Sequence, residues 1–401
     1  MCVTRRDFLK TTAAGLTAFL LPRPLVRKAF GAAGTPVLVV VYLRGGSDGL
    51  TICPPAGDPV YYDLRPTIQV PPGSELPLDG FFGLYPSFAD LLPLYQSGAL
   101  AIFHASGSPD PSRSHFDSQD FMERAAPGNK QILDGWLNRY LQAAGGGVAL
   151  QGVTLANAKV KSMQGAAPSL AFASIADFVL TGESVAERRA ALEARYELLQ
   201  GTLLGGSVTD ALAAVDVIGG VDTTTAVTYP AGELGPLLRD AAALVKADIG
   251  VKVVAVNLGG WDHHSDQLAH MDGLGAELGA ALAAFHQDLG ADAATTLTLC
   301  MTEFGRRPAE NGAGGSDHGH GGVMFALGGG IAGGRVILRD GTWPGLAPGS
   351  LYNGQDLAVT TDFRDIFAEV LHKHMLLDVA AMGPVFPGFS VSEASFPGLL
   401  T

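Results

Sequence analysis

Two short, glycine-rich runs of this sequence bring carboxylate and imidazole side chains together. The run at 262–264 reads Asp-His-His, and the run at 317–320 reads Asp-His-Gly-His. Carboxylate oxygens and imidazole nitrogens are ligands for zinc, manganese and similar divalent cations. The surrounding glycines allow the backbone to bend so that alternate side chains point inward. The two runs therefore predict a metal site, with Asp262, His264, His318 and His320 as candidate ligands.

Two further acids stand directly after apolar stretches. Asp48 follows a β-branched run in a glycine-rich turn, and Glu303 follows Thr302 at the end of another apolar run. Together with the four residues above they make six candidate ligands for one or two divalent ions. Zinc, manganese, magnesium and calcium all fit a mixed set of oxygen and nitrogen ligands.

The elements that must position these residues follow an alternating pattern. Strands are expected at 35–43, 100–104, 251–258, 295–301 and 323–327, and helices from about Ser114 and at 184–200, 234–246, 266–289 and 361–372. Strands that alternate with helices predict an α/β fold with a mostly parallel sheet covered by helices on both faces. In such sheets ligands bind beyond the carboxyl ends of the strands, where Asp48, Asp262 and Glu303 are expected to converge.

A polar segment before the first of these helices holds candidates for the reacting centre. Ser114 would lie at a helix N-terminus, where free N–H groups stabilise an alkoxide or a bound oxyanion. The alternative role for Ser114 is a helix N-cap, with Asp117 three residues later as in a capping box. His115 is a candidate ligand or general acid, and Arg113 a candidate anion-binding catalytic residue.

Two other arginines are candidate substrate-binding residues. Arg44 follows the first strand and Arg306 closely follows Glu303, so either guanidinium could bind an oxygen of a phosphate or sulfate. A role in ordinary salt bridges is equally open for both.

The N-terminus has the features of an export signal. Arg5 and Arg6 are paired, Phe8 comes two residues later, and a short apolar run and small residues follow. This pattern predicts a twin-arginine signal peptide at 1–33, recognised by the twin-arginine translocase, and a periplasmic or secreted protein. Residues 34–401 would then form a single domain, with a helical insert near 145–230.

Composition excludes several classes of partner. The formal net charge is −13, and removal of 1–33 would make the chain more acidic, since that segment holds six basic residues and one acid. An acidic surface repels nucleic acid and anionic lipid. No stretch after the signal is apolar for long enough to predict a stable membrane span. A small anionic ester would therefore need local positive charge, which metal ions would supply.

Several motifs in this sequence resemble known proteins. The chain resembles the alkaline phosphatase and sulfatase superfamily and, more closely, an uncharacterised family of bacterial twin-arginine-exported proteins described as sulfatase-like. The residues that carry the resemblance are Leu43-Arg44-Gly45-Gly46-Ser47-Asp48-Gly49, Pro111-Ser112-Arg113-Ser114-His115-Phe116-Asp117, Gly259-Gly260-Trp261-Asp262-His263-His264, Thr302-Glu303-Phe304-Gly305-Arg306 and Asp317-His318-Gly319-His320-Gly321. The superfamily implies a three-layer α/β/α sandwich and two metal sites that clamp an ester oxyanion.

The resemblance divides the candidate ligands between two ions. Asp262 and His264, with His318 or His320, would hold one ion, and Asp48 and Glu303 would contribute to the other. The sequence departs from the superfamily at two points. Phe304 stands where a histidine ligand is expected, and Pro109 stands at the position of the sulfatase nucleophile.

Two functions follow from these features. The first is an exported metal-dependent hydrolase of a sulfate or phosphate ester. The second is a non-catalytic, metal-stabilised binding or assembly protein of the cell envelope on the same scaffold. The acid and histidine runs favour the hydrolase, and the proline at the nucleophile position favours the binding protein.

Overall fold

The computed structural model describes residues 34–179, 184–197 and 203–400. The expected twin-arginine signal at 1–33 lies outside the described residues. No helix in the described part of the chain is both long enough and apolar enough to cross a membrane.

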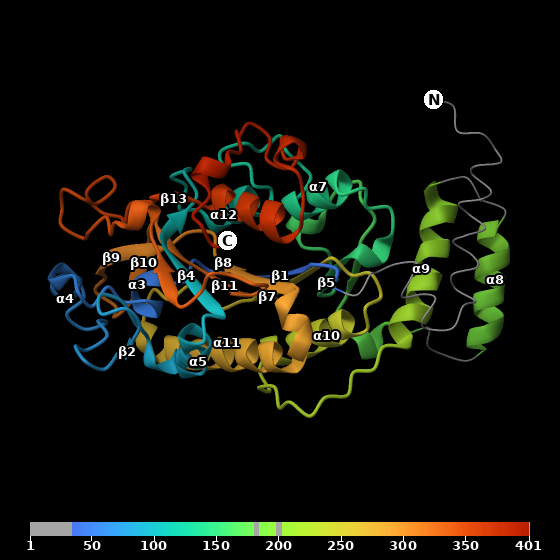
Figure 1. Cartoon of the computed structure of the whole chain (residues 1–401), viewed down its shortest axis with the longest axis horizontal. Coiled ribbons are helices and arrows are strands. Elements are labelled where there is room, and N and C mark those ends of the chain that lie inside the picture. Colours follow the sequence, from blue (N-terminus) through green and yellow to red (C-terminus); the bar gives the residue numbers. More distant parts are fainter. Residues whose placement is uncertain (1–33, 180–183, 198–202, 401) are drawn as a thin grey trace.

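A single large sheet forms the centre of the described chain (Figure 1). Its strand order is β12-β4-β11-β8-β1-β7-β5-β6, with β13 beside β4. The strands are β1 (Val37–Leu43), β4 (Leu100–Gly107), β5 (Gly152–Leu155), β6 (Leu170–Phe172), β7 (Val253–Leu258), β8 (Thr296–Met301), β11 (Gly322–Gly328), β12 (Arg335–Ile337) and β13 (Thr361–Asp362). Strand β11 is antiparallel to both of its neighbours, and the other pairs are parallel. The predicted mostly parallel sheet is confirmed.

Strand β1 explains why helices cover both faces of this sheet. Its seven residues are all apolar and all buried. Successive side chains of a strand point to opposite faces. Accordingly, Val37, Val39 and Val41 pack with α10 (Leu234–Lys246) and α11 (Gln267–Leu289). Leu38, Val40 and Tyr42 pack on the other face with α7 (Trp136–Ala143) and α12 (Phe363–Glu369). The predicted three-layer α/β/α arrangement is confirmed (Figure 1).

The segment from 145 to 230 differs from the helical insert expected there. Its first part contributes β5 and β6, which extend the sheet beside β7. The α-helices of this segment follow only afterwards, as α8 (Val185–Glu197) and α9 (Leu203–Gly219), at the end of the molecule away from β4 in Figure 1. Short strands were missed because four- and three-residue runs carry too little periodicity to distinguish them from loops.

One edge of the sheet gathers the loops that carry the candidate residues. Strands β1, β7 and β8 are mutually parallel, so their carboxyl ends lie at the same edge. Because β11 runs the opposite way, its first residue lies at that edge as well. The residues before β11 form a two-stranded ribbon of β9 (Arg306–Glu310) and β10 (Ser316–His318). The acidic and histidine-rich runs are therefore neighbours.

Candidate metal centre

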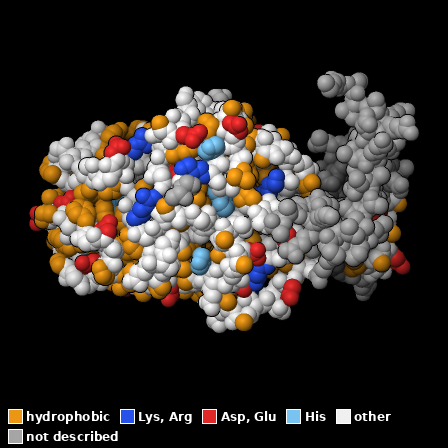
Figure 2. Space-filling view, viewed as in Figure 1, with side chains coloured by type: hydrophobic (Ala, Val, Ile, Leu, Met, Phe, Trp, Pro, Cys, Tyr) orange, Lys and Arg blue, Asp and Glu red, His pale blue; other side chains and the backbone are white. Residues whose placement is uncertain are grey.

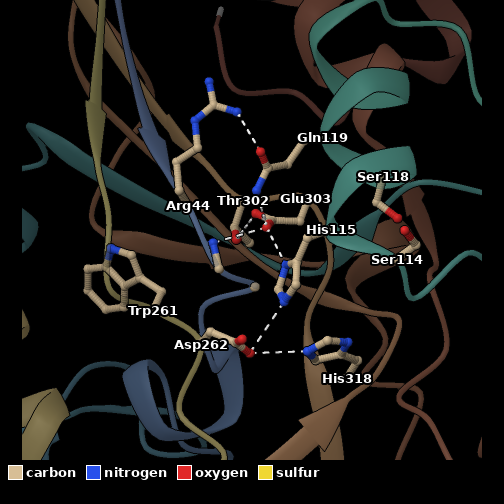
Figure 3. A network of polar contacts seen from close by, with 12 residues as sticks. Arg44, Ser114, His115, Ser118, Gln119, Trp261, Asp262, Thr302, Glu303 and His318 are labelled. Carbon is tan, nitrogen blue, oxygen red and sulfur yellow. Dashed lines mark hydrogen bonds and ion pairs between the residues drawn. The ribbon is translucent and has the colours of Figure 1, made fainter.

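Three elements from distant parts of the chain meet at this edge (Figure 3). The turn after β7 carries Asp262 and His264, β10 ends at His318, and α6 (His115–Glu123) begins with His115. Helix α6 starts here because the hydroxyl of Ser114 caps it by accepting from the Asp117 N–H at 3.5 Å. The cap places His115 on the first turn, facing the sheet.

The side-chain heads of these residues converge on one carboxylate oxygen. Asp262 Oδ1 lies 3.3 Å from His115 Nε2, 3.1 Å from His318 Nε2 and 3.0 Å from His264 Nε2. One ligand atom each from His115, Asp262 and His318 lie within 4.8 Å of one another. The side chains of His115 and Asp262 are 24% and 47% exposed, so small molecules from solvent can reach the cluster.

The contact made by Nδ1 of His318 determines which nitrogen of this ring carries the hydrogen. Nδ1 lies 2.8 Å from the backbone carbonyl oxygen of Arg113. A carbonyl can only accept, so Nδ1 carries the hydrogen. Burial lowers the pKa of His318, which favours the neutral ring. In neutral His318, Nε2 is then an unprotonated nitrogen whose lone pair faces Asp262.

His115 is held in the same way by a buried acid. Its Nδ1 lies 2.8 Å from Oε1 of Glu303, whose side chain is 0% exposed. Burial alone would raise the pKa of Glu303, but hydrogen bonds from His115, Gln119 and the Gly45 N–H outweigh it and lower the pKa. Glu303 is therefore an ionised acceptor, and Nδ1 is the donor. Among the residues that the structure describes, the buried His115 Nε2 has no hydrogen-bond partner.

Asp262 is also ionised. Burial raises its pKa, but the hydrogen bond from the buried Arg306 guanidinium and the positive charge of that group outweigh burial and lower the pKa. One carboxylate oxygen and two imidazole nitrogens thus present lone pairs to one another. Such an arrangement is repulsive without a proton or a metal cation between the atoms, and its chemistry is that of a zinc-type ligand set. His115, Asp262 and His318 therefore fit a divalent cation, with His264 beside them.

Glycine allows two of these loops to approach closely. A side chain at Gly45, whose φ is +124°, would place its Cβ 2.6 Å from the backbone nitrogen of Asp262. A side chain at Gly315 would collide with the backbone of His264. Larger residues at either position would separate the turns that carry the cluster.

The arginines expected to bind substrate have protein partners in the structure. Arg306 is fully buried and donates to the carbonyl oxygens of Gly45, Gly46 and Ser316 at 2.5–2.9 Å, as well as to Asp262. Arg44 pairs with Glu123 at 2.8 Å and donates to Asn257 and Gln119. Arg113 pairs with the buried Asp356, and its side chain remains 35% exposed. Of the three, Arg113 is therefore the most accessible.

Two expected ligands lie among other groups. Both oxygens of the buried Asp48 face Arg65, at 2.6 and 3.1 Å, and Gln267 donates to Oδ2 at 2.5 Å. His320 stacks on Tyr352, with ring centroids 4.7 Å apart. Neither belongs to the group formed by His115, Asp262 and His318. Glu303 touches the group only through His115.

Ser114 lies beside the cluster but does not face it. Its hydroxyl is committed to the cap, and Figure 3 shows it directed toward Ser118 rather than toward Asp262. The contacts of Ser114 therefore support its expected role as a helix N-cap rather than its expected role at the reacting centre.

Sequence reasoning missed Gln119 and Arg65. Gln119 Nε2 donates to Glu303 at 2.8 Å. Its position four residues after His115 on α6 was a usable signal, because residues at that spacing share a helix face. Arg65 caps the C-terminus of the short helix α4 (Pro59–Leu64) and reaches Asp48 from there. No local pattern marked that contact.

Comparison with known proteins identifies a family but no activity. The family model described as "Protein of unknown function (DUF1501)" matches residues 95–383. No curated protein matched the chain.

Solved structures are similar only at a low level. The C-terminal periplasmic domain of EcEptC from Escherichia coli aligns with 89% of this chain and 88% of its own length at 11% identity, with a TM-score of 0.40. The lipoteichoic acid synthase LtaP from Listeria monocytogenes aligns with 92% and 77% at 11% identity and a TM-score of 0.35. A mutant TAB5 alkaline phosphatase with bound Mg aligns with 75% and 92% at 10% identity and a TM-score of 0.31.

Proposed function

This chain belongs to the DUF1501 family, whose description assigns no activity, and we propose from its site that it is an exported, metal-dependent hydrolase of a phosphate or sulfate ester. One divalent cation would be held by His115 Nε2, Asp262 Oδ1 and His318 Nε2, with His264 as a fourth contact. The observation that carries the proposal is the convergence of three lone-pair donors within 4.8 Å.

The surroundings of the site resemble those of a functional metal centre. Metal-bound histidines usually donate their other ring N–H to a carboxylate or a backbone carbonyl. His115 does so to Glu303 and His318 does so to Arg113, both at 2.8 Å. A divalent cation supplies Lewis acidity and lowers the pKa of bound water toward neutrality, which is the chemistry needed for ester hydrolysis without a side-chain nucleophile.

Two partly exposed arginines beside the cluster offer donors to an anionic substrate. Arg113 and Arg307 both lie against the single buried carboxylate of Asp356, and their side chains are 35% and 32% exposed. Asp317 links this pair to the site, since it lies 3.5 Å from His264 Nδ1 and 3.9 Å from Arg307. Two guanidinium groups at the rim could bind phosphoryl or sulfuryl oxygens. On the face drawn in Figure 2, acidic and basic side chains are interspersed.

The remaining candidate is a metal-stabilised binding or assembly protein of the cell envelope. The observation that favours it is that the Ser114 hydroxyl caps α6 rather than facing the cluster. In that case the cation would hold α6, the β7 turn and the β9–β10 ribbon together without turnover.

Metal analysis combined with an ester screen separates these functions. We expect purified protein to contain zinc or another divalent metal and to hydrolyse p-nitrophenyl phosphate or p-nitrophenyl sulfate. His318→Ala should lose both the metal and the activity. His286→Ala is the matched control, because His286 lies in the last turn of α11, roughly 28 Å along the helix from its first residue. Bound metal without turnover of either ester would favour the binding protein, and absence of metal from the wild type would overturn both.

A further inference from the structure

We infer that Arg44, Gln119 and Glu303 form a hydrogen-bonded relay that fixes which nitrogen of His115 carries its hydrogen, and so presents Nε2 unprotonated to the cation (Figure 3). These three are positioning residues, because they act only through His115. The inference rests on the proposed metal site and adds residues outside the ligand set.

The relay starts at Arg44, whose guanidinium donates to three side chains of the protein. Arg44 donates from Nε and Nη2 to Asn257 Oδ1 at 3.1 and 2.9 Å, and from Nη1 to Glu123 at 2.8 Å. The same Nη1 lies 3.0 Å from Gln119 Oε1. The ring of Tyr42 lies 4.0 Å below the guanidinium and restricts its movement. Arginine has no acceptor, so the group that Gln119 turns toward it must be the carbonyl oxygen.

The direction of the Gln119 carbonyl oxygen also determines where its NH₂ group lies. With Oε1 toward Arg44, Gln119 must present its NH₂ group to Glu303, at 2.8 Å. An NH₂ group only donates, so Glu303 Oε1 must accept. The same oxygen accepts from the Gly45 N–H at 3.0 Å. The Thr302 hydroxyl lies 3.2 Å from Oε2 and donates to the Leu43 carbonyl oxygen at 2.9 Å. The contacts with the Gln119 NH₂ group and the Gly45 N–H therefore both require Oε1 of Glu303 to be an acceptor.

The last step concerns the shared hydrogen between Glu303 and His115. Because Oε1 is already an acceptor of two N–H groups, the hydrogen in the 2.8 Å contact belongs to His115 Nδ1. The protonated nitrogen of a neutral histidine is set by the hydrogen bond that its ring makes. His115 is thereby held as the Nδ1–H form, with Nε2 directed at Asp262. Reversal of the Gln119 amide would remove this constraint.

The first test is spectroscopic and uses the metal-free wild-type protein. Labelling of histidine with ¹⁵N and a long-range ¹H–¹⁵N spectrum, assigned with a His115→Gln variant, reports the protonation of each ring nitrogen. We expect a pyrrole-type shift at Nδ1 and a pyridine-type shift at Nε2 for neutral His115. An Nε2–H form, or a mixture of both forms, would refute the relay. This measurement needs no substitution of Arg44, Gln119 or Glu303.

The second test compares two substitutions of Gln119 by competition for Zn²⁺ against a chelator. Gln119→Met removes the donor and should weaken Zn²⁺ binding by roughly 10- to 100-fold, the usual effect of losing a supporting partner. Gln119→Glu keeps the shape but sets a second acceptor against Glu303, and should weaken binding further. A packing role predicts the reverse order, since Glu is closer to Gln in shape than Met is. That reverse order, or unchanged affinity in both variants, would refute the relay.

The control variant is Ser118→Ala on the same helix. The Ser118 hydroxyl donates to the Ser112 carbonyl oxygen at 3.0 Å and makes no hydrogen bond to Arg44, Gln119, Glu303 or His115. This variant should retain the wild-type affinity for Zn²⁺. The proposed metal-dependent function and the proposed relay can be refuted independently of each other. If the wild-type protein shows the Nδ1–H form but binds no Zn²⁺, the relay stands and the metal-dependent function falls; if it binds Zn²⁺ with the opposite form, only the relay falls.

Discussion

His264 Nε2 lies 2.9 Å from His318 Nε2, although the two residues belong to separate loops, one after β7 and one before β11. Both nitrogens also contact Asp262 Oδ1. Two imidazole nitrogens this close need a hydrogen or a cation between them. The antiparallel direction of β11 is what brings the second loop to the carboxyl ends of β7 and β8.

His264 contacts the cluster and His320 does not, so substitutions of the two residues should affect metal affinity differently. We expect His264→Ala to weaken Zn²⁺ binding by at least roughly tenfold, since its ring contacts both Asp262 and His318. His320→Ala should leave affinity unchanged, because that ring stacks on Tyr352. Isothermal titration with Zn²⁺ measures both. Equal losses in the two variants would contradict the assignment of ligands.

Ser114 tests whether the reaction uses a side-chain nucleophile. Ser114→Ala should lower the free energy of unfolding by about 1 kcal/mol, the usual cost of a lost N-cap, and leave turnover per folded molecule unchanged. Ser114→Asp, which can still cap the helix, should recover the stability. Chemical denaturation and ester hydrolysis are the two measurements. A fall in kcat of several orders of magnitude in both variants would identify Ser114 as the nucleophile instead.

The dependence of metal affinity on pH should report His115. The hydrogen bond to Glu303, opposed by burial and aided by the charges of Glu303 and Asp262, raises the pKa of His115 above its ordinary value of 6.5. A proton on Nε2 competes with the cation, so affinity should be constant above the raised pKa and should fall as pH decreases through it. Zn²⁺ titrations across pH measure the midpoint. Glu303→Gln removes the main cause of the raised pKa and should move the midpoint to lower pH; an unshifted midpoint would exclude His115 as the titrating ligand.

The ion pair between Asp48 and Arg65 should matter for stability and not for metal content. Both side chains are buried, at 1% and 0% exposure. Arg65→Met would leave Asp48 charged and unpaired in the interior, which typically costs about 3–5 kcal/mol. Combined replacement with Asp48→Leu should recover part of that loss. Thermal unfolding measures the stability, and metal analysis of the folded fraction of Arg65→Met should still give one cation per chain. If the wild type instead binds a second cation, and that cation is lost when Asp48 is replaced, then the two-ion arrangement implied by the sequence would be correct.

Local patterns in the sequence were sufficient for the layers of the fold and for the general position of the site. The run Val37–Leu43 is apolar throughout, so a strand buried on both faces was predictable from composition alone. An acid directly after such a strand must emerge at the carboxyl edge of a parallel sheet. The sequence alone therefore places Asp262 at that edge, and it also predicts the helix that begins at His115, because Ser114 is a cap residue.

Only the tertiary structure determined which polar side chains contact one another. Asp48 and Glu303 carry the same functional group as Asp262, yet Arg65 meets the first and His115 the second. These partners come from segments whose sequence spacing carries no information about their distance in space. The direction of β11 likewise depends on which neighbours it pairs with, and not on its own residues. Periodicity specifies the face on which a side chain lies, whereas its partner depends on how separate elements pack.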